Sequence, residues 1–257
     1  MPIITLTTDW NKQDFYSGAL KGHILKQIED VRIIDITHNI KPFNIPEAAF
    51  ILRNSYHHFP EGSVHIIGVK SELTEKQSHL IIKKNHHYFI GADNGIFGLM
   101  FSDPPEQIIR ISQKPNPATF PELYVFSEMG CEILKGTDIE KLGETVEDMF
   151  KRVPIRPTID DSVIIGKVVY IDSFSNAITN ITRDLFYRVA DNRRFQIYVQ
   201  SNTNRISRIS KTYQENPEGE LLAIFNSLNL LEISMNGGNA AEILSLDTDS
   251  TVRIRFN

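Results

Sequence analysis

Acidic side chains follow two apolar segments near the start of the chain. In "IITLTTDWN", Asp9 comes directly after the apolar run Ile3–Leu6, and Asp35 and His38 lie at the end of a second run. Ligands of an open parallel sheet bind outside the carboxyl ends of its strands, which is where these residues are expected. An Asp at such a place is as often a helix N-cap or an Asx turn. Asp14, immediately before a helical pattern, is the better cap candidate, which leaves Asp9 for a ligand.

A second group of polar residues lies late in the chain, in "VVYIDSFSNAITNI". An apolar strand runs into Asp172, Phe174 and Asn176 before another strand begins. Phe174 can stack on a planar ring, and Asn176 can make paired hydrogen bonds to an adenine edge. Taken alone, such a segment is more often a turn with an Asx motif than a binding site.

Other motifs argue against several classes of enzyme. All eight histidines fall between residues 23 and 87 without an i, i+4 pair on a helix, so surface or structural roles are favoured and no metal site is expected. The glycine-rich stretches 91–98 and 236–239 lack the spacing of a dinucleotide or P-loop motif and fit tight turns. The first strand–helix turn has no glycine, which argues against a Rossmann methyltransferase. No GxSxG elbow occurs, and Cys131 fits a packed thiol better than a nucleophile.

The first half of the chain alternates short apolar runs with helical patterns. Strands are expected at residues 3–6, 32–36, 64–69, 80–83, 88–90 and 108–111, and helices at 15–28, 46–56 and around 95–100. This alternation predicts a layered α/β/α domain with a mostly parallel sheet over residues 1–153.

The second half has a different pattern. The stretch "KRVPIRPTIDDS" has two prolines and no apolar period, so residues 154–162 are predicted to be a linker. Short β runs follow at 163–171, 195–200, 221–225, 230–234 and 252–256, with brief helices at 183–188 and 239–244. A smaller C-terminal β-barrel domain is therefore expected over residues 163–257.

Composition narrows the partners and the compartment. The 257 residues carry a net charge of −5, with basic and acidic residues mixed, so neither nucleic acid nor an anionic membrane surface is an expected partner. No apolar run approaches the length of a membrane span, and no signal peptide is visible. The single cysteine fits a reducing compartment. The cytoplasm is the expected location.

Read together, these segments resemble the S-adenosyl-L-methionine (SAM) hydroxide adenosyltransferases, or SAM hydrolases, which are related to the fluorinase and chlorinase. The stretches that carry the resemblance stand in order over most of the chain: "IITLTTDW…DFYSGALKGHI", "VRIIDITHNIKPFNIPEAAFIL", "FPEGSVHIIGV", "YFIGADNGIF", "VVYIDSFSNAITNI" and "EGELLAIFNSLNLLEISMNGGNAAEIL". The resemblance implies a homotrimer with SAM, as substrate rather than cofactor, held between the first domain of one subunit and the second domain of its neighbour.

The resemblance also implies roles for individual residues. Asp9 would bind the ribose hydroxyls, Phe43 would line the ribose pocket and Phe120 would pack near the reacting carbon. Asp172 would hold the methionine ammonium. Ser227 would help to hold the carboxylate, although Leu228 stands where the halogenating branch has an arginine.

The adenine contacts follow from the same resemblance. Phe174 and Tyr213 would sandwich the ring. Asn176 and the backbone around Met235 and Asn236 would read its polar edge.

The resemblance breaks at the residues that handle water. In the hydrolases, water attacks the ribose C5′ and releases methionine, so that adenosine and methionine form. The activating Asp, Arg and His correspond here to Lys70, Gln77 and Pro121. Glu122, next to the position of the histidine, and Lys70 are the candidates for altered water handling. A small gap in the loop could bring Glu72 or Lys76 there instead.

Two hypotheses therefore remain from the sequence. The first is a SAM-cleaving enzyme with an atypical water-activating loop, with Lys70, Gln77 and Glu122 as candidate catalytic positions. The alternative is a non-catalytic protein that binds SAM or adenosine and has lost the activating residues. Pro121 and Glu122 argue against halide binding, because a carboxylate would repel the anion.

Overall fold

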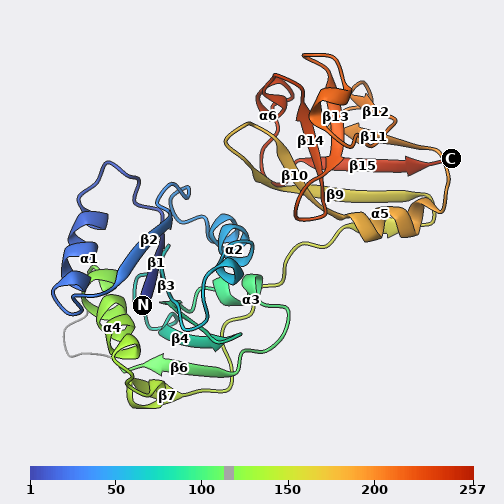
Figure 1. Ribbon diagram of the computed structural model, residues 1–257. Helices are drawn as coiled ribbons and strands as arrows, with labels where there is room; N and C mark the ends of the chain where they lie inside the picture. The colour runs from blue at the N-terminus through green and yellow to red at the C-terminus, as the bar shows by residue number, and fades with distance from the viewer. Residues whose placement is uncertain (113–118) are drawn as a thin grey trace. The chain divides into compact units, whose positions relative to one another are not determined.

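The structure is a computed structural model that describes residues 1–112 and 119–257 (Figure 1). The chain divides into two compact units, Met1–Val153 and Pro154–Asn257. Each unit has its own sheet and its own hydrophobic core.

The N-terminal unit is built on a seven-stranded sheet in the order β2-β1-β3-β5-β4-β6-β7. Its strands are β1 (Ile3–Thr8), β2 (Arg32–Thr37), β3 (Val64–Gly68), β4 (His79–Lys84), β5 (His87–Ala92), β6 (Gln107–Ile111) and β7 (Gly143–Thr145). The pairs β1–β2, β1–β3 and β3–β5 are parallel, whereas β4–β5, β4–β6 and β6–β7 are antiparallel.

A tight hairpin accounts for the antiparallel half of this sheet. Asn85 and His86 connect β4 to β5, and both have positive φ, at 51° and 61°. Two consecutive residues in this conformation form the turn that matches the twist of antiparallel strands. The two runs that the sequence indicated at 80–83 and 88–90 are therefore direct neighbours.

Helices cover both faces of the N-terminal sheet, which confirms the layered α/β/α arrangement (Figure 1). The helices are α1 (Tyr16–Leu25), α2 (Ile45–Arg53), α3 (Ile96–Met100) and α4 (Ser127–Leu134), with short turns η1 (Tyr56–His58), η2 (Glu122–Phe126) and η3 (Ile139–Lys141). Side chains of α1 and α4 share one core with the sheet, and side chains of α2 and α3 share a second core. Cys131 is fully buried in the first core, which raises the pKa of its thiol to about 11.

Helix α1 begins without the predicted cap. The residue before it is Phe15, no side chain caps it, and the expected role of Asp14 as its N-cap is wrong. Phe15 is already helical at φ −70° and ψ −13°, whereas a capping side chain needs a non-helical residue in that position. Helix α2 does have a side-chain cap: Asn44 Oδ1 accepts a hydrogen bond from the Glu47 amide at 3.2 Å.

The C-terminal unit is an antiparallel sheet that nearly closes on itself, which confirms a barrel-like second domain. Its strands are β8 (Thr158–Asp160), β9 (Val163–Ile171), β10 (Ala177–Thr182), β11 (Phe195–Val199), β12 (Arg205–Ile206), β13 (Leu221–Phe225), β14 (Leu230–Met235) and β15 (Thr251–Phe256). The main order is β12-β11-β15-β9-β10-β14-β13, and a bridge between Ser210 and Ile224 connects the segment after β12 to β13. Inward-facing apolar residues of these strands form one core with helix α5 (Arg183–Ala190) and helix α6 (Ala240–Ile243).

The segment predicted to be a linker is partly ordered as a strand. Residues 158–160 form β8, which pairs with β9 and so belongs to the C-terminal sheet. In the described part of the chain, no helix is both long enough and apolar enough to cross a membrane.

Candidate functional site

Asp9 lies just beyond the carboxyl end of β1 and holds the segment that follows β2. Its Oδ2 accepts a hydrogen bond of 2.8 Å from the backbone N–H of Phe43. Phe43 is in the left-handed region at φ 64°, and 66% of it is exposed. A bulky residue in this conformation is strained. The carboxylate of Asp9 thus stabilises a turn that presents an aromatic ring to solvent.

Asp9 is half-buried, and this changes its acidity. Burial raises the pKa of Asp9 above its ordinary value, while hydrogen bonds from the backbone N–H groups of Phe43, Asp9 and Lys70 act in the opposite direction. A carboxylate that is partly desolvated yet surrounded by donors is suited to accept further hydrogen bonds from hydroxyl groups.

An aromatic cluster lies beside Asp9. The ring of Trp10 packs edge-on against Phe120 at 5.0 Å between centroids, and Phe120 packs edge-on against Tyr16 at 5.3 Å. Phe120, expected near the reacting carbon, is therefore held by rings from the segment that follows β1. This part of the unit offers apolar surface directly next to the Asp9 carboxylate.

Asp35 and His38 have structural partners. His38 is buried, with its Nδ1 2.7 Å from Thr8 Oγ1 and its Nε2 3.1 Å from Asp35 Oδ1. Asp35 also accepts from Lys21 Nζ at 2.6 Å. These contacts connect the ends of β1 and β2 and hold the edge of the sheet at which Asp9 lies.

Glu122 is a buried carboxyl group at the same edge. It opens the π-helical turn η2, directly before α4, and only 2% of it is exposed. Ser71 Oγ donates a hydrogen bond to Glu122 Oε1. At Gly68, an added Cβ would lie 2.9 Å from Glu122 Oε1 and 3.0 Å from Trp10 Cζ2. The carboxyl group is therefore packed directly against the end of β3.

Burial has a large effect on the acidity of Glu122. Desolvation raises its pKa to about 7, the Ser71 hydroxyl lowers it, and the negative charge of Asp9 raises it further. A carboxyl group with this pKa exchanges a proton near neutral pH.

The loop after β3 is closed by its own side chains and backbone. Gln77 Nε2 donates to the carbonyl oxygens of Lys70 at 3.0 Å and of Glu72 at 2.6 Å. Asn94 Nδ2 donates to the carbonyl oxygen of Val69 at 3.0 Å. Gln77 thus has a structural task, although the sequence made it a catalytic candidate. Lys70 is exposed and has left-handed backbone at φ 46°.

In the C-terminal unit, Asp172 and Asn176 form the tip of the β9–β10 hairpin. Asp172 Oδ1 accepts from the backbone N–H groups of Phe174 and Asn176, both at 2.9 Å, and its Oδ2 accepts from Asn176 Nδ2 at 3.0 Å. This is the Asx turn that the sequence left open as an alternative. The hairpin leaves Phe174 74% exposed, while Asn176 is buried.

Tyr213 is tied to a buried carboxylate. Its hydroxyl donates to Glu232 Oε1 at 2.8 Å, and Glu232 also accepts from Ser234 Oγ and Asn226 Nδ2. Burial, together with Glu232 and the charge of Asp172, raises the pKa of Tyr213 to about 12. Tyr213 is thereby held against β14, the strand that pairs with β10.

The remaining predicted contacts lie in loops of the same unit. The backbone N–H of Asn236 donates to Glu220 O at 3.2 Å, and its carbonyl accepts from Gly219 N at 2.8 Å. Its side chain donates to Asn216 O at 2.8 Å. Met235 is partly buried and Ser227 is exposed. Both backbone polar groups of Asn236 are therefore already paired within the unit.

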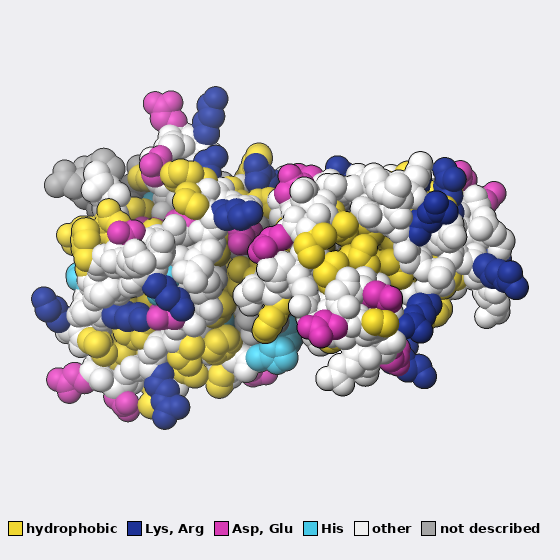
Figure 2. All heavy atoms as spheres, turned by 90° about the horizontal axis from the view of Figure 1, so that it is seen from above, with side chains coloured by type: hydrophobic (Ala, Val, Ile, Leu, Met, Phe, Trp, Pro, Cys, Tyr) yellow, Lys and Arg dark blue, Asp and Glu magenta, His cyan; other side chains and the backbone are white. Residues whose placement is uncertain are grey.

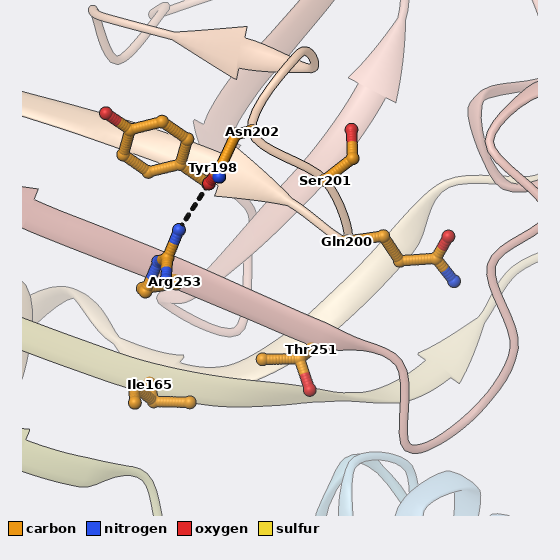
Figure 3. Close-up of a pocket in the computed structure, with 7 residues that line it drawn as sticks. All are labelled: Ile165, Tyr198, Gln200, Ser201, Asn202, Thr251 and Arg253. Atoms are coloured by element: carbon orange, nitrogen blue, oxygen red, sulfur yellow. Dashed lines mark hydrogen bonds between the residues drawn. The ribbon is translucent and has the colours of Figure 1, made fainter.

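A pocket of about 360 Å³ opens elsewhere on the C-terminal unit (Figure 3). It is lined by Ile165, Tyr198, Gln200, Ser201, Asn202, Thr251 and Arg253. Arg253 Nη2 donates to Asn202 Oδ1 at 2.6 Å, as the dashed line shows. The predicted ligand residues are not part of this lining. Among the predicted ligand residues, the rings of Phe43, Phe174 and Tyr213 are exposed. On the face that Figure 2 shows, hydrophobic and charged side chains are mixed.

The structure thus brings the predicted residues together in two groups, one in each unit. Asp9, Phe43, Phe120 and Glu122 surround the ends of β1 and β3, and Asp172, Phe174, Asn176 and Tyr213 surround the β9–β10 hairpin. Three residues of these surroundings were missed from the sequence: Ser71, His79 and Glu232. Glu232 could have been found from the sequence, because it is the one charged residue in the apolar run "LLEISM".

The chain matches known proteins over both units. Residues 4–143 match the model of the SAM hydroxide adenosyltransferase N-terminal domain, and residues 166–253 match that of the C-terminal domain. A protein of Methanocaldococcus jannaschii named (R)-S-adenosyl-L-methionine hydrolase is 34% identical over 268 residues, which cover 100% of this chain and 97% of that protein.

Two further matches extend along nearly the whole chain. A protein of the same name from Thermus thermophilus is 26% identical and covers 96% of this chain and 97% of its own length. A crystal structure of an uncharacterised conserved protein from Thermotoga maritima has a TM-score of 0.87 and 26% identity, with 99% of this chain and 100% of that chain covered. The chain belongs to the SAM hydroxide adenosyltransferase family.

Proposed function

We propose that this protein is an enzyme that cleaves SAM with water at the ribose C5′ to give adenosine and L-methionine. The observation that carries the proposal is the hydrogen bond from the backbone N–H of Phe43 to the half-buried Asp9 carboxylate. It stabilises Phe43 in a left-handed backbone conformation, at φ 64°, with its aromatic ring exposed. Such a pair combines acceptors for ribose hydroxyls with an apolar wall for the sugar. Relatives named as SAM hydrolases along the whole chain support this reaction.

The C-terminal unit would supply the contacts to adenine and methionine. Phe174 is 74% exposed and Tyr213 is 42% exposed, so both rings have a free face for stacking on a purine. Asp172 would hold the methionine ammonium with lone pairs that its turn leaves available. Ser227 and the turn at Met235 and Asn236 complete the proposed substrate contacts. The protein would act as a homotrimer whose sites combine the N-terminal unit of one subunit with the C-terminal unit of its neighbour.

The sulfonium charge of SAM disappears during the reaction. An aromatic, poorly hydrated environment therefore favours the transition state relative to the charged substrate. Trp10, Phe120 and Phe43 provide aromatic surface next to Asp9. Glu122, a buried carboxyl group with a pKa of about 7, would position the water and accept its proton.

A second candidate function is binding of SAM or adenosine without turnover. Its support is the state of the loop after β3, where the Gln77 amide is occupied by the carbonyl groups of Lys70 and Glu72. Because the Gln77 amide nitrogen donates to these two carbonyl groups, it is not free to orient a water molecule. Without a general base, a factor of about 10²–10⁴ in rate is lost.

One experiment separates the two functions. The purified protein is incubated with SAM, and adenosine and methionine are quantified by chromatography against a buffer control. Equal amounts of both products above the control are expected. Intact SAM together with a raised melting temperature would instead support the binder. No product and no thermal shift with SAM, adenosine or methionine would reject both.

A further inference from the structure

Ser71 supports the buried carboxyl group at the N-terminal site, and both its hydroxyl and its backbone carbonyl have partners. Ser71 Oγ donates to Glu122 Oε1, and the carbonyl oxygen of Ser71 is 2.8 Å from His79 Nε2. His79 is 5% exposed, and its ring packs edge-on against Phe126 at 4.8 Å, in the same turn as Glu122. Ser71 is thus fixed on two sides, and its hydroxyl is directed at the carboxyl group.

Burial favours the neutral form of His79. Desolvation lowers the pKa of His79, and the hydrogen bond to Ser71 opposes this shift. Since the carbonyl of Ser71 can only accept, Nε2 carries the proton of the neutral ring. His79 is therefore a fixed donor that holds the backbone of Ser71.

We propose, on the basis of the proposed function, that Ser71 is the positioning residue that holds Glu122 to accept a proton from the attacking water. This pair would activate the water in place of the Asp, Arg and His of the hydrolases. The chain has Lys70, Gln77 and Pro121 at those three positions. Positions 70 and 121 carry an exposed lysine and a proline, and the amide at position 77 is engaged in closing the loop.

The proposed step is balanced. The water oxygen forms a bond to C5′ while the bond from C5′ to sulfur breaks, and the electron pair of that bond remains on sulfur. Methionine leaves as a neutral thioether. The proton lost by the water passes to the Glu122 carboxylate and is later released to solvent, so that no further reactant is required.

The groups that face Glu122 are matched to this task. Asp9, at the end of β1, contributes a negative charge that favours the protonated form, and the Ser71 hydroxyl favours the ionised form. Gly68, at the end of β3, packs closely against the Glu122 side chain and also lies close to Trp10. Because the hydroxyl stabilises the carboxylate, removing it should raise the pKa of Glu122.

The test measures two quantities in the full-length protein. The first is kcat/KM for adenosine release from SAM between pH 5.5 and 9.5, and the second is the carboxyl titration of Glu122 by infrared difference spectroscopy, with E122Q to assign the band. In S71A, the acidic limb of the rate profile and the Glu122 titration should both move upward by about half a pH unit or more. S71T, which keeps the hydroxyl, should retain both.

Two controls separate positioning from general damage. S63A removes another buried hydroxyl of the same unit, which donates to Pro60 O at 2.6 Å, and should leave the rate profile unchanged. E122Q should lower kcat by about 10²–10⁴-fold at unchanged melting temperature.

The outcomes distinguish this inference from the function on which it rests. Adenosine release with an unshifted acidic limb in S71A would overturn the role of Ser71 and leave SAM hydrolysis standing. Adenosine release with full activity in E122Q would overturn the role of Glu122. Absence of adenosine with the wild-type protein would reject the proposed function. It would also reject the role of Glu122 as the general base.

Discussion

Two carboxyl groups at the N-terminal site have different surroundings and therefore suit different tasks. Asp9 is half-buried, and this burial raises its pKa, while hydrogen bonds from backbone N–H groups act in the opposite direction. Glu122 is almost wholly buried and has a single hydroxyl donor from Ser71, and its pKa is about 7. A half-buried carboxylate with several backbone donors fits binding of hydroxyl groups, whereas a group that exchanges protons near neutral pH fits general-base chemistry.

Asp9→Asn should weaken adenosine binding by about 10- to 100-fold, since a hydrogen bond to a charged group contributes about 1.5–3 kcal/mol. The amide oxygen can still accept from the Phe43 N–H, so the fold should persist. Isothermal titration with adenosine measures the change. Asp14→Asn is the matched control, because Asp14 does not cap α1. Unchanged affinity in Asp9→Asn would remove Asp9 from the ribose site.

At the scale of elements, the end of β3 and the start of η2 meet at Gly68. A methyl group there would lie 2.9 Å from Glu122 Oε1, closer than such contacts permit, and 3.0 Å from Trp10, which is tighter than most such contacts. Gly68→Ala should therefore displace the carboxyl group and lower kcat for SAM by about tenfold or more, because small misplacements of reacting groups are costly.

The control for this substitution is Gly22→Ala in α1. An added Cβ at Gly22 meets no atom within 4 Å, and alanine favours a helix by about 1 kcal/mol over glycine. Gly22→Ala should thus raise the melting temperature and leave kcat unchanged. Wild-type turnover in Gly68→Ala would contradict the close packing of Glu122 against β3.

Three neighbouring strands share a buried histidine pair. Thr5 Oγ1 in β1 is 2.7 Å from His65 Nδ1 in β3, and His65 Nε2 is 3.1 Å from His87 Nδ1 in β5. Desolvation lowers the pKa of His65 to about 3, and the neighbouring His87 adds to this effect. The pKa of His87 is also lowered, mainly by desolvation, with the charge of Glu61 acting in the opposite direction.

The sign of the resulting pH dependence follows from proton binding. Between pH 6.5 and pH 3 the unfolded chain binds a proton at residue 65 that the folded protein does not, so acidification lowers the free energy of unfolding by about 1.4 kcal/mol per pH unit for this group. Urea unfolding from pH 7.5 to 4.5 measures it. The dependence should be shallower in His65→Gln, and an equal slope in both proteins would contradict the assignment.

Most elements were predictable from the sequence because their apolar patterns are regular. The strand over 163–171 was predicted with its observed bounds, and the strands over 3–8 and 32–37 differ from prediction only at their ends. Helix α4 (Ser127–Leu134) was missed from the sequence. The antiparallel half of the N-terminal sheet depends on two residues with positive φ, Asn85 and His86, which are not typical turn glycines.

The predicted site divides in a similar way. Asp9 was identifiable because it ends an apolar strand, and the structure gives it a defined partner in Phe43. Ser71 and His79 were missed because their contacts to Glu122 and to one another join residues up to 51 positions apart. Such contacts depend on the path of the loop after β3, which no local pattern specifies.

At the scale of the whole molecule, the proposed substrate contacts are divided between two compact units. The residues proposed to contact the ribose and the attacking water belong to Met1–Val153, and those proposed to contact adenine and methionine belong to Pro154–Asn257. Their exposed rings, Phe43 at 66% and Phe174 at 74%, need a covering ligand or partner to become part of a dry site. A homotrimer with shared sites would provide both.

Mixing two inactive variants tests this sharing. D9A damages the N-terminal half of each site and D172A the C-terminal half, so each homotrimer should be inactive. If every site combines two subunits, co-refolded equal mixtures should recover roughly a quarter of the wild-type sites, because that fraction pairs an intact half from each variant. Adenosine release from SAM measures the recovery, and sedimentation checks that the mixture forms trimers. Recovery requires that the two halves come from different chains, whereas sites built within one chain would stay inactive at every mixing ratio.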